Sequence, residues 1–390
     1  MKKKVPVFVL VLACVLCMAA GGLVTLGVLH HAVGEDGMAL LQAQVLIRNR
    51  FVGEYDPDLV RQAAERALVE ELGDRWSSYL TPEEYRQTVQ TRDNNYVGVG
   101  ITIQEAEEGL QVISVARDGP AEEAGITAGD VICAVDGVPV TPENREASIQ
   151  RIRGEAGTTV TLDLLSETGE RRSVTVTRDQ VLVRSADWKM LEGDTALLTI
   201  ENFYTGAASQ VSACLDEMTE EGAGALVIDL RFNPGGYVTE MTRVLDLLLP
   251  EGDIFRMEYY NGRERVYRSD EDSIGLPMAV LVNENTYSAA ELMAAQIRET
   301  TGGPVVGTRT SGKGYSQNLF PLRDGSAINL SCARYFTGGG TSLIGTGLVP
   351  DPYVGLSIAR QWDLLMGQLA PEDDGQLQAA LRALDGRPDT

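Results

Sequence analysis

The chain has 390 residues, of which 44% are hydrophobic and 23% are charged, and its formal net charge at pH 7 is −23. This composition is typical of an ordered globular chain of two or three domains that can bury its own core. The negative charge, which no basic stripe offsets, excludes nucleic-acid binding, because that function needs clustered Lys and Arg.

The N-terminal residues 1–33 predict a membrane anchor. Three lysines at positions 2–4 precede an uncharged run over residues 5–29, which as a helix can cross a hydrocarbon core of about 30 Å. The lysines are expected to stay in the cytoplasm, so the rest of the chain would lie outside it. Small residues at 19–21 could instead form a signal-peptide cleavage site, which would give a secreted protein. Because the apolar run continues past them, the uncleaved single-pass anchor is favoured.

Two segments of different pattern follow. Residues 34–92 carry apolar residues at helical spacing and predict an N-terminal helical region. From residue 93 the pattern changes to short alternating strands with glycine turns, such as YVGVGITI and DVICAVDG, interrupted by one helix, PENREASIQRIR. Residues 93–180 are therefore predicted to form one compact module.

Strands and helices alternate over residues 181–355. The strands ALLTIENF, ALVIDL and MAVLVN are each followed by a helical segment. This order predicts βαβ crossovers and a layered α/β core. The tail, residues 356–390, contains EDDGQLQAALRAL, which predicts a short surface helix.

Histidine and cysteine usage limits the chemistry. The two histidines, His30 and His31, lie directly beside the predicted anchor. A Ser-His-Asp triad, a Cys-His pair and a His-ligated zinc site are therefore excluded from the rest of the chain. Cys133, Cys214 and Cys332 are far apart and in apolar contexts, which predicts buried thiols rather than a disulfide framework. No metal or organic cofactor is implied, and a hydrolase must use another base.

The segment NENTYSAAEL, residues 283–292, begins a predicted helix and contains Ser288. Ser288 and Glu291 match the S-x-x-E capping box, in which the serine oxygen accepts a hydrogen bond from a backbone N–H three residues later. Taken alone, these residues favour a helix cap. A nucleophile is the alternative, and the rest of the chain has to decide between them.

A glycine-rich stretch, GTRTSGKG at 307–314, matches the G-x-x-x-x-G-K start of a phosphate-binding loop. Gly314 replaces the Ser or Thr that would hold magnesium, and the following YSQNLFPL predicts a strand rather than a phosphate-facing helix. A turn between two strands is favoured, and a nucleotide-dependent enzyme is the weakest alternative.

Two further glycine stretches have a structural and a functional interpretation. RFNPGGY, at 231–237, is typical of a turn, but its paired glycines could bring backbone N–H groups to an oxyanion. In YVGVGITI, at 96–103, two glycines flank a valine before a strand. Such a loop could present N–H groups to a terminal carboxylate while the strand pairs with a peptide. A glycine bulge in an ordinary strand is the alternative.

In this order the pieces resemble the carboxyl-terminal processing proteases, also called tail-specific proteases. The similarity covers the chain from about residue 50 to about residue 355. VGVGI, GPAEEAGITAGDVICAVDG and RIRGEAGTTVTLDLL are similar to the family's PDZ domain, LVIDLRFNPGGY to its glycine turn and GTGLVPDPYV to its closing segment. The resemblance implies an α/β fold: a layered, crotonase-like protease core with an inserted PDZ domain and helical N- and C-terminal segments after the membrane helix.

The resemblance also implies site residues. The family's nucleophile lies in an S-A-x-E context that opens a helix, here Ser288, and its general base is a lysine in a G-K-G turn, here Lys313. A glutamine four residues after the lysine completes the set, here Gln317. The lysine can act as a base only when neutral, so burial must lower its pKa. Ser288 would then form an acyl-enzyme rather than serve only as a cap.

Backbone groups complete the implied sites. One oxyanion donor would lie at the N-terminus of the Ser288 helix and a second in the glycine turn. The residues implied are Ala289, Gly235 and Gly236 for the oxyanion hole, and Gly98, Val99, Gly100 and Ile101 for peptide binding by the PDZ domain.

Two residues depart from the family pattern. The family commonly alternates Ser and Ala before the Glu, whereas this chain has TYSAAE, with Tyr287 and Ala290 at the unusual positions. Tyr287 could narrow the approach to Ser288, which leaves the turnover rate and the P1 preference open. Arg153, in RGEAG, could couple the PDZ domain to the core or be a solvated turn residue.

The implied function is a serine endopeptidase of the bacterial cell membrane. It would cleave extracytoplasmic proteins at or near their C-terminal region, after the PDZ domain binds their exposed C-termini. Similar proteins dimerise through helical end segments, so residues 37–90 and 356–385 are candidate contacts of a homodimer. The alternative is a non-catalytic, PDZ-bearing peptide-binding scaffold. Retention of Ser288, Lys313 and Gln317 together with the glycine turn argues against it.

Overall fold

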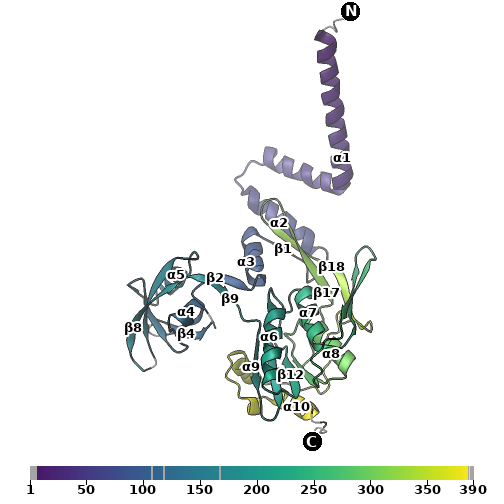
Figure 1. Ribbon diagram of the computed structural model, residues 1–390. Coiled ribbons are helices and arrows are strands. Elements are labelled where there is room, and N and C mark those ends of the chain that lie inside the picture. Colours follow the sequence, from purple (N-terminus) through teal and green to yellow (C-terminus); the bar gives the residue numbers. More distant parts are fainter. Residues whose placement is uncertain (1–6, 107–108, 117–118, 167, 385, 387–390) are drawn as a thin grey trace, which may run out of the picture. The chain divides into compact units, whose positions relative to one another are not determined.

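The computed structural model describes residues 7–106, 109–116, 119–166, 168–384 and 386 (Figure 1). The chain divides into two units, Met1–Leu68 and Val69–Thr390. The first unit contains α1 (Val7–Arg50) and most of α2 (Pro57–Glu70). Within α1, Gly34 leaves the helical conformation with a φ of 71°, one residue after the predicted end of the anchor.

No helix among the described residues combines the length and the apolarity needed to cross a bilayer. The predicted membrane segment, residues 5–29, falls mainly on side chains outside that description. The anchor therefore stays a prediction.

Residues 93–180 form the predicted β module. Its antiparallel sheet has the order β3 (Ile101–Ala106), β4 (Gly109–Val115), β5 (Val131–Val135), β7 (Thr159–Leu165) and β8 (Arg171–Thr177), with β6 (Val138–Pro139) paired to β5. Two helices, α4 (Pro120–Glu123) and α5 (Arg145–Ile152), complete it. Alternate residues of β7 are buried, as expected for a sheet with one face on a core. β3 forms one edge of the described sheet.

A separate pair of strands marks the ends of this module. β2 (Asn95–Gly98) precedes β3 and pairs antiparallel with β9 (Asp179–Leu182), which follows β8. The predicted boundaries at 93 and 180 therefore lie within a few residues of this strand pair.

The core of residues 181–355 has the predicted layered α/β arrangement. Its central sheet has the order β10 (Ala186–Met190), β11 (Thr195–Ile200), β12 (Ala225–Asp229), β15 (Met278–Val282) and β16 (Val305–Gly307). All its pairs are parallel except β10 with β11. The crossovers contain α6 (Ala207–Glu220), α7 (Val238–Leu248) and α8 (Ala289–Thr301). The likeness to the crotonase fold stays a prediction.

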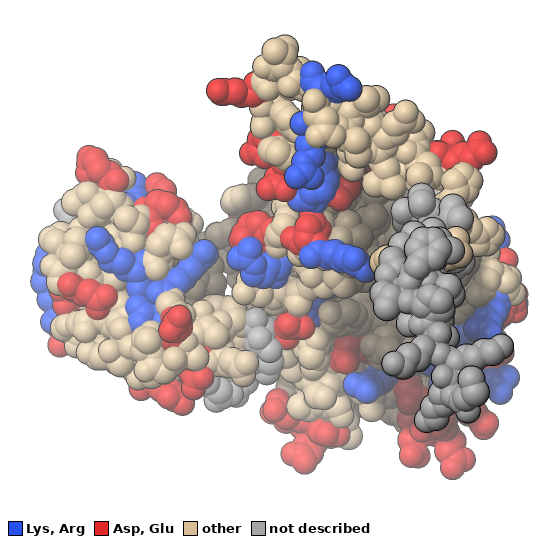
Figure 2. All heavy atoms as spheres, turned by 90° about the horizontal axis from the view of Figure 1, so that it is seen from above, with Lys and Arg blue, Asp and Glu red and all other residues tan. Residues whose placement is uncertain are grey.

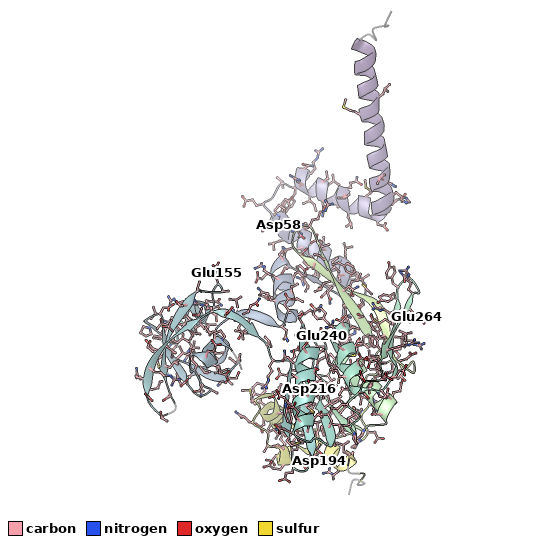
Figure 3. All side chains as sticks on the ribbon, in the orientation of Figure 1. Asp58, Glu155, Asp194, Asp216, Glu240 and Glu264 are labelled. Carbon is pink, nitrogen blue, oxygen red and sulfur yellow. The ribbon has the colours of Figure 1, made fainter. Side chains whose placement is uncertain are left out.

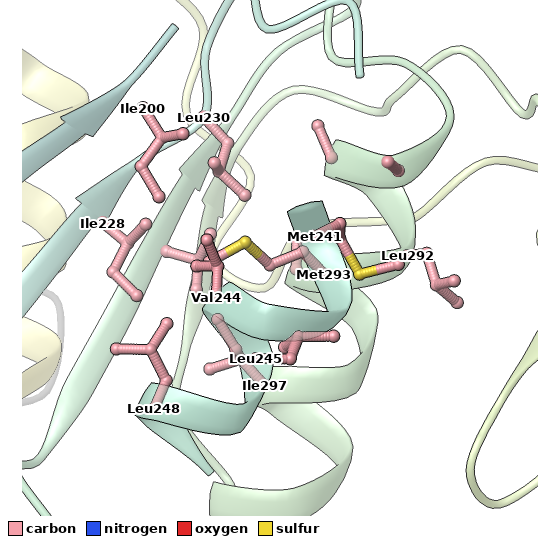
Figure 4. Close-up of a cluster of buried hydrophobic side chains, with 14 of the residues drawn as sticks. Ile200, Ile228, Leu230, Met241, Val244, Leu245, Leu248, Leu292, Met293 and Ile297 are labelled. Atoms are coloured by element: carbon pink, nitrogen blue, oxygen red, sulfur yellow. The ribbon is translucent and has the colours of Figure 1, made fainter. Parts of the chain in front are cut away.

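One face of the central sheet is covered by helices α6, α7 and α8. Met241 and Val244 of α7 pack with Ile228 of β12 in a continuous buried cluster (Figure 4). All five residues of β15 are buried, which is typical of a parallel strand with both faces covered.

The other face is covered by α10 (Gly375–Leu384), which follows α9 (Ile358–Leu365) and a short 3-10 turn (Pro371–Asp373). Leu377 and Ala380 of α10 pack with Val227 and Leu281 of the sheet. Arg231 contacts Asp374 at 2.8 Å in a buried ion pair, which fixes the start of α10. The helix predicted in this tail is therefore present, but its predicted surface position was wrong, because it seals the sheet face.

A second sheet adjoins these layers. It has the order β1 (Ser78–Leu80), β18 (Ala327–Thr337), β13 (Gly252–Tyr259) and β14 (Glu264–Ser269), and β17 (Tyr315–Pro321) also pairs with β18. β1 comes from the region predicted to be helical, 34–92, so that prediction was wrong for this strand. The next element, α3 (Pro82–Arg92), begins with a capping box formed by Thr81 and Glu84.

Several acidic side chains are exposed, whereas the thiols are buried or half-buried. Asp194, Asp216 and Glu264, which are labelled in Figure 3, are exposed. Acidic and basic side chains are interspersed over the face shown in Figure 2. Cys133, Cys214 and Cys332 form no disulfide within the part of the chain that the structure describes. Cys214 is buried as predicted, whereas Cys133 and Cys332 are only half-buried.

Candidate active site

A cavity of about 540 Å³ lies between the glycine turn, the start of α8 and the β17–β18 hairpin. We call it the Ser288 cavity. It brings together residues from segments that are far apart in the sequence. Among the predicted site residues, those that line it are Ser288, Ala289, Gly236, Lys313 and Gln317.

Ser288 lies at the sharp turn between β15 and α8. Its φ is +56°, a left-handed conformation that a non-glycine residue adopts at a cost of about 1–3 kcal/mol. The preceding turn is fixed from inside, because the Thr286 hydroxyl donates to the Leu230 carbonyl at 2.9 Å. The Tyr287 N–H donates to the Asn233 carbonyl at 2.9 Å. Neighbouring turns therefore hold Ser288 in the strained position.

Lys313 lies in the loop between β16 and β17. Burial lowers the pKa of its ammonium from 10.5 to about 8, and the positive charge of Arg92 acts in the same direction. The carboxylates of Glu291 and Asp74 oppose this shift and only partly offset it. A substantial fraction of Lys313 is therefore neutral, and able to accept a proton, at mildly alkaline pH.

Glu291 joins the two predicted catalytic segments. Its buried carboxylate accepts hydrogen bonds from the N–H of Ser288 at 2.9 Å and the N–H of Lys313 at 3.0 Å. It also accepts from the Gly312 N–H at 2.7 Å and from two hydroxyls, those of Thr310 and Ser311. The Glu291 half of the predicted capping box is thus formed, and the same carboxylate also positions the lysine loop.

The segment before β1 packs against this loop. The ammonium of Lys313 lies 5.0 Å from the centre of the Trp76 ring. The Arg75 guanidinium stacks on the same ring at 4.3 Å and donates to the Ser311 carbonyl at 3.2 Å. Tyr287 meets Trp76 edge to face, with ring centres 6.4 Å apart. Tyr287 thus packs on Trp76 and is not among the described residues that line the Ser288 cavity.

Two predicted oxyanion donors line the cavity, and the third is otherwise engaged. Ala289 and Gly236 border the cavity, and no hydrogen bond is formed by their N–H groups within the described residues. The Gly235 N–H instead donates to the Asn233 side-chain oxygen at 2.8 Å. Gly235 therefore contributes by its shape: an added Cβ would lie 3.0 Å from Ala289 N and from Ser288 Cβ.

Gln317 and Tyr335 complete the cavity wall. The Gln317 amide donates to the Tyr315 carbonyl at 3.1 Å and the Ser331 hydroxyl at 3.2 Å, so in this structure it does not bind Lys313. The buried Tyr335 hydroxyl donates to the Lys313 carbonyl. Burial raises the pKa of Tyr335 well above its usual value, with a further rise from Glu291 and a smaller opposing effect of its hydrogen bond with Ser288.

Comparisons with known proteins agree with this arrangement. Residues 194–354 match the model of peptidase family S41, and residues 87–165 match the PDZ domain. The carboxy-terminal processing protease CtpA of Bacillus subtilis is 28% identical over 90% of this chain and 77% of its own length. Residues 194–354 thus have the pattern of an S41 peptidase, and the chain as a whole is similar to the carboxyl-terminal processing proteases. It is a serine-type peptidase with a PDZ domain.

Further relatives support the same family and fold. A CtpA-like serine protease of Staphylococcus haemolyticus is 26% identical over 88% of this chain and 71% of its own length. A crystal structure assigned to the S41 proteases of Bacteroides fragilis superposes with a TM-score of 0.57. It is 17% identical and covers 89% of this chain and 97% of that chain, which shows the shared fold.

The predicted peptide-binding loop of the protease connects β2 to β3. Gly98, Val99 and Gly100 are buried and Ile101 is half-buried. Gly100 has a φ of +82°, which favours glycine. Its carbonyl accepts from the Ala116 N–H at 2.8 Å, which fixes the loop against the end of β4.

Sequence reasoning missed four residues of the protease site: Asp74, Trp76, Arg92 and Tyr335. The first three come from the region interpreted only as helical, and β1 and α3 bring them beside Lys313. Their local sequence carries no sign of this, because strand pairing between β1 and β18 is a long-range contact. Tyr335 lies in β18, and its local sequence carries no catalytic motif.

Proposed function

We propose that the protease cleaves peptide bonds with Ser288 as nucleophile and Lys313 as general base. The observation that carries the proposal is that both residues line one cavity in which the pKa of Lys313 is lowered to about 8. The only two histidines lie at positions 30 and 31, and beyond the first four residues the only lysines are Lys189 and Lys313. Lys189 is exposed on β10, which leaves Lys313 as the lysine suited to the task.

The reaction follows from these positions. Neutral Lys313 takes the proton of the Ser288 hydroxyl as its oxygen attacks the peptide carbonyl carbon. The developing oxyanion accepts hydrogen bonds from the N–H groups of Ala289 and Gly236, and α8 adds its positive N-terminal dipole. Protonated Lys313 then gives its proton to the leaving amine, which leaves an acyl-enzyme. Water, deprotonated by Lys313, hydrolyses the ester and regenerates Ser288.

We propose further that the PDZ domain binds substrate C-termini. β3 lies at the sheet edge, so a peptide strand can add to it, and the loop of residues 98–101 lies at its start. Backbone N–H groups of this loop would bind the terminal carboxylate. Gln317 would orient Lys313 or a water after a local side-chain rearrangement, since it now binds Tyr315 and Ser331.

The proposed location is the outer side of a bacterial membrane, with residues 5–29 as a single-pass anchor. The support is the uncharged run after three lysines; cleavage of this segment would give a secreted enzyme. A homodimer is proposed from exposed apolar side chains on the end segments. Leu59 and Leu68 of α2 and Ile358 and Trp362 of α9 are all more than half exposed.

A non-catalytic scaffold is the second candidate. Its main support in the sequence was Tyr287 beside Ser288. In the structure the Tyr287 ring packs on Trp76, which weakens that support. The strained Ser288 and the half-buried Lys313 with its lowered pKa favour the enzyme, because a non-catalytic core needs neither feature.

The test uses the full chain in detergent with a disordered protein that ends in apolar residues as substrate. Ser288→Ala and Lys313→Ala should abolish the fragments seen by mass spectrometry, and Lys189→Ala, the matched control, should leave them unchanged. Equal cleavage by all variants would reject the dyad. Binding without cleavage by every variant, including the parent, would favour the scaffold.

A further inference from the structure

The Ser288 cavity has a charge opposite to that of the chain. The chain contains 56 acidic and 33 basic residues. The described residues that line the cavity nevertheless include two cations, Arg92 and Lys313, and no Asp or Glu. The net charge of the chain is negative, yet the described lining of this cavity has two cations and no carboxylate. The cavity is therefore suited to an anionic ligand.

Arg92 is held at this cavity by its backbone. Its carbonyl accepts hydrogen bonds from both the N–H and the hydroxyl of Thr205, each at 3.1 Å. α3, which Arg92 ends, is fixed at its other end by the Thr81 cap and by the pairing of β1 with β18. The adjacent Tyr204 also lines the cavity. The position of Arg92 is therefore part of the fold rather than of a loose surface helix.

The guanidinium of Arg92 makes no ion pair within the described residues. Arg86, six residues earlier on α3, has an exposed ion pair with Glu83 at 2.7 Å. A half-buried, unpaired guanidinium is poorly solvated, and a carboxylate is the ligand that its planar fork matches best.

The two cations have different parts in the proposed reaction. Lys313 must be neutral to act as base, whereas an arginine stays charged at every accessible pH. Arg92 is then the permanent positive charge of the cavity. Tyr204 and Tyr237 line the cavity with it, and burial raises the pKa of both phenols, so they stay neutral hydrogen-bond donors. A carboxylate bound here would meet one cation and two hydroxyl groups.

We propose that Arg92 recognises a carboxylate of the bound peptide close to the scissile bond. The inference rests on the proposed function, since it assigns a substrate class to the same cavity. The carboxylate has two possible sources, the C-terminus of the peptide or an Asp or Glu side chain. In either case Arg92 makes acidic peptides better substrates than their neutral counterparts.

The test compares matched peptides on the full-length enzyme. One pair differs only in a free or an amidated C-terminus a few residues from the cleaved bond. The other pair is amidated and differs only in Glu or Gln near that bond. Each pair is measured with the parent, Arg92→Gln, Arg92→Lys and the control Arg86→Gln, at a pH well above 8, where Lys313 is mostly neutral.

We expect the acidic member of at least one pair to have a kcat/KM about 10–100-fold higher, as for a hydrogen-bonded charge pair. Arg92→Gln should remove this preference, Arg92→Lys should keep part of it, and Arg86→Gln should leave it unchanged. The pair that responds identifies the source of the carboxylate. Any contribution of the PDZ domain is common to the parent and the variants, and it cancels when their preference ratios are compared.

Two results would overturn the proposal. One is an unchanged preference in Arg92→Gln, and the other is a parent that does not discriminate within either pair. If the enzyme cleaves and Ser288→Ala does not, either result rejects Arg92 while the dyad stands. If nothing is cleaved, the same peptides are titrated onto Ser288→Ala and onto Ser288→Ala with Arg92→Gln. Equal affinity ratios for these two proteins would then reject the carboxylate site independently of catalysis.

Discussion

The Glu291 carboxylate accepts a hydrogen bond from the N–H of Lys313, 22 residues further along the chain, at 3.0 Å. Glu291 also lies in the first turn of α8, three residues after Ser288. One buried side chain thus couples the start of the nucleophile helix to the loop that carries the lysine. The contribution of Glu291 to kcat can be measured separately from that of Ser288 and Lys313.

Replacing Glu291 by Gln should lower kcat by at least about tenfold with little change in KM. The Gln NH₂ would face backbone N–H groups and hydroxyls that now donate to a carboxylate, so two donors would be left unpaired at about 1–3 kcal/mol each. The loop would then shift and move the Lys313 ammonium relative to Ser288. Steady-state kinetics and thermal unfolding measure the two effects.

Glu284→Gln is the matched control for that variant. Glu284 is exposed and accepts one hydrogen bond, from the Thr308 hydroxyl at 2.6 Å. Its replacement should leave kcat within about twofold and the free energy of unfolding within about 0.5 kcal/mol. If Glu291→Gln behaves in the same way, Glu291 does not position the dyad.

The rate of cleavage should rise with pH, with an inflection near 8. Lys313 is active only when neutral, and its pKa is lowered to about 8 mainly by burial. Because Asp74 raises this pKa and Arg92 lowers it, Asp74→Asn should move the inflection to lower pH and Arg92→Gln to higher pH. Shifts of kcat/KM in the same direction for both variants would contradict this electrostatic account.

The lowered pKa of Lys313 should also affect the free energy of unfolding. Unfolded Lys313 keeps a pKa of about 10.5, whereas the folded group titrates near 8. Between these values the unfolded chain binds more protons than the folded one, so the contribution of Lys313 to the free energy of unfolding rises with pH. Denaturant titrations from pH 7 to 10 should show this rise in the parent, reduced in Lys313→Met. The same slope in both proteins would place the linkage elsewhere.

The sequence predicted the α/β core and the β module because their signals, alternating strands and glycine turns, are local. The candidate dyad came from the family resemblance, because taken alone the sequence around Ser288 favours a helix cap and that around Lys313 a turn. The strand β1 and the burial of α10 escaped prediction for the opposite reason, because their signals are not local. SYL in β1 gains its strand conformation from β18, and α10 is buried only because a sheet face is open beneath it. The charge environment of Lys313 was invisible for the same reason, since Asp74 and Arg92 reach it through β1 and α3.

The burial of α10 predicts a measurable cost. Leu377 is 2% exposed and packs with Val227 and Leu281. Leu377→Ala should lower the free energy of unfolding by about 2–5 kcal/mol through lost contacts and a cavity. Leu365→Ala on α9, where the side chain is 52% exposed, should cost less than about 1 kcal/mol. Equal, small costs in urea denaturation would show that the tail does not seal the sheet.

The glycine turn allows a test in which backbone strain and active-site shape are separated. Gly235 and Gly222 have nearly the same φ, +85° and +86°, so an alanine should cost each about 1–2 kcal/mol of stability. At Gly222 an added Cβ meets no atom within 4 Å, whereas at Gly235 it would lie 2.9 Å from the Tyr287 carbonyl oxygen and 3.0 Å from Ala289 N.

Gly235→Ala should therefore push the start of α8 away from the turn and separate the two proposed oxyanion donors, Ala289 and Gly236. Loss of one such donor typically lowers kcat by about 10²–10³. Gly222→Ala, with matched destabilisation, should keep kcat. If both variants lose activity in proportion to stability, the turn acts only through folding. If neither loses activity, the oxyanion hole does not lie between the turn and α8.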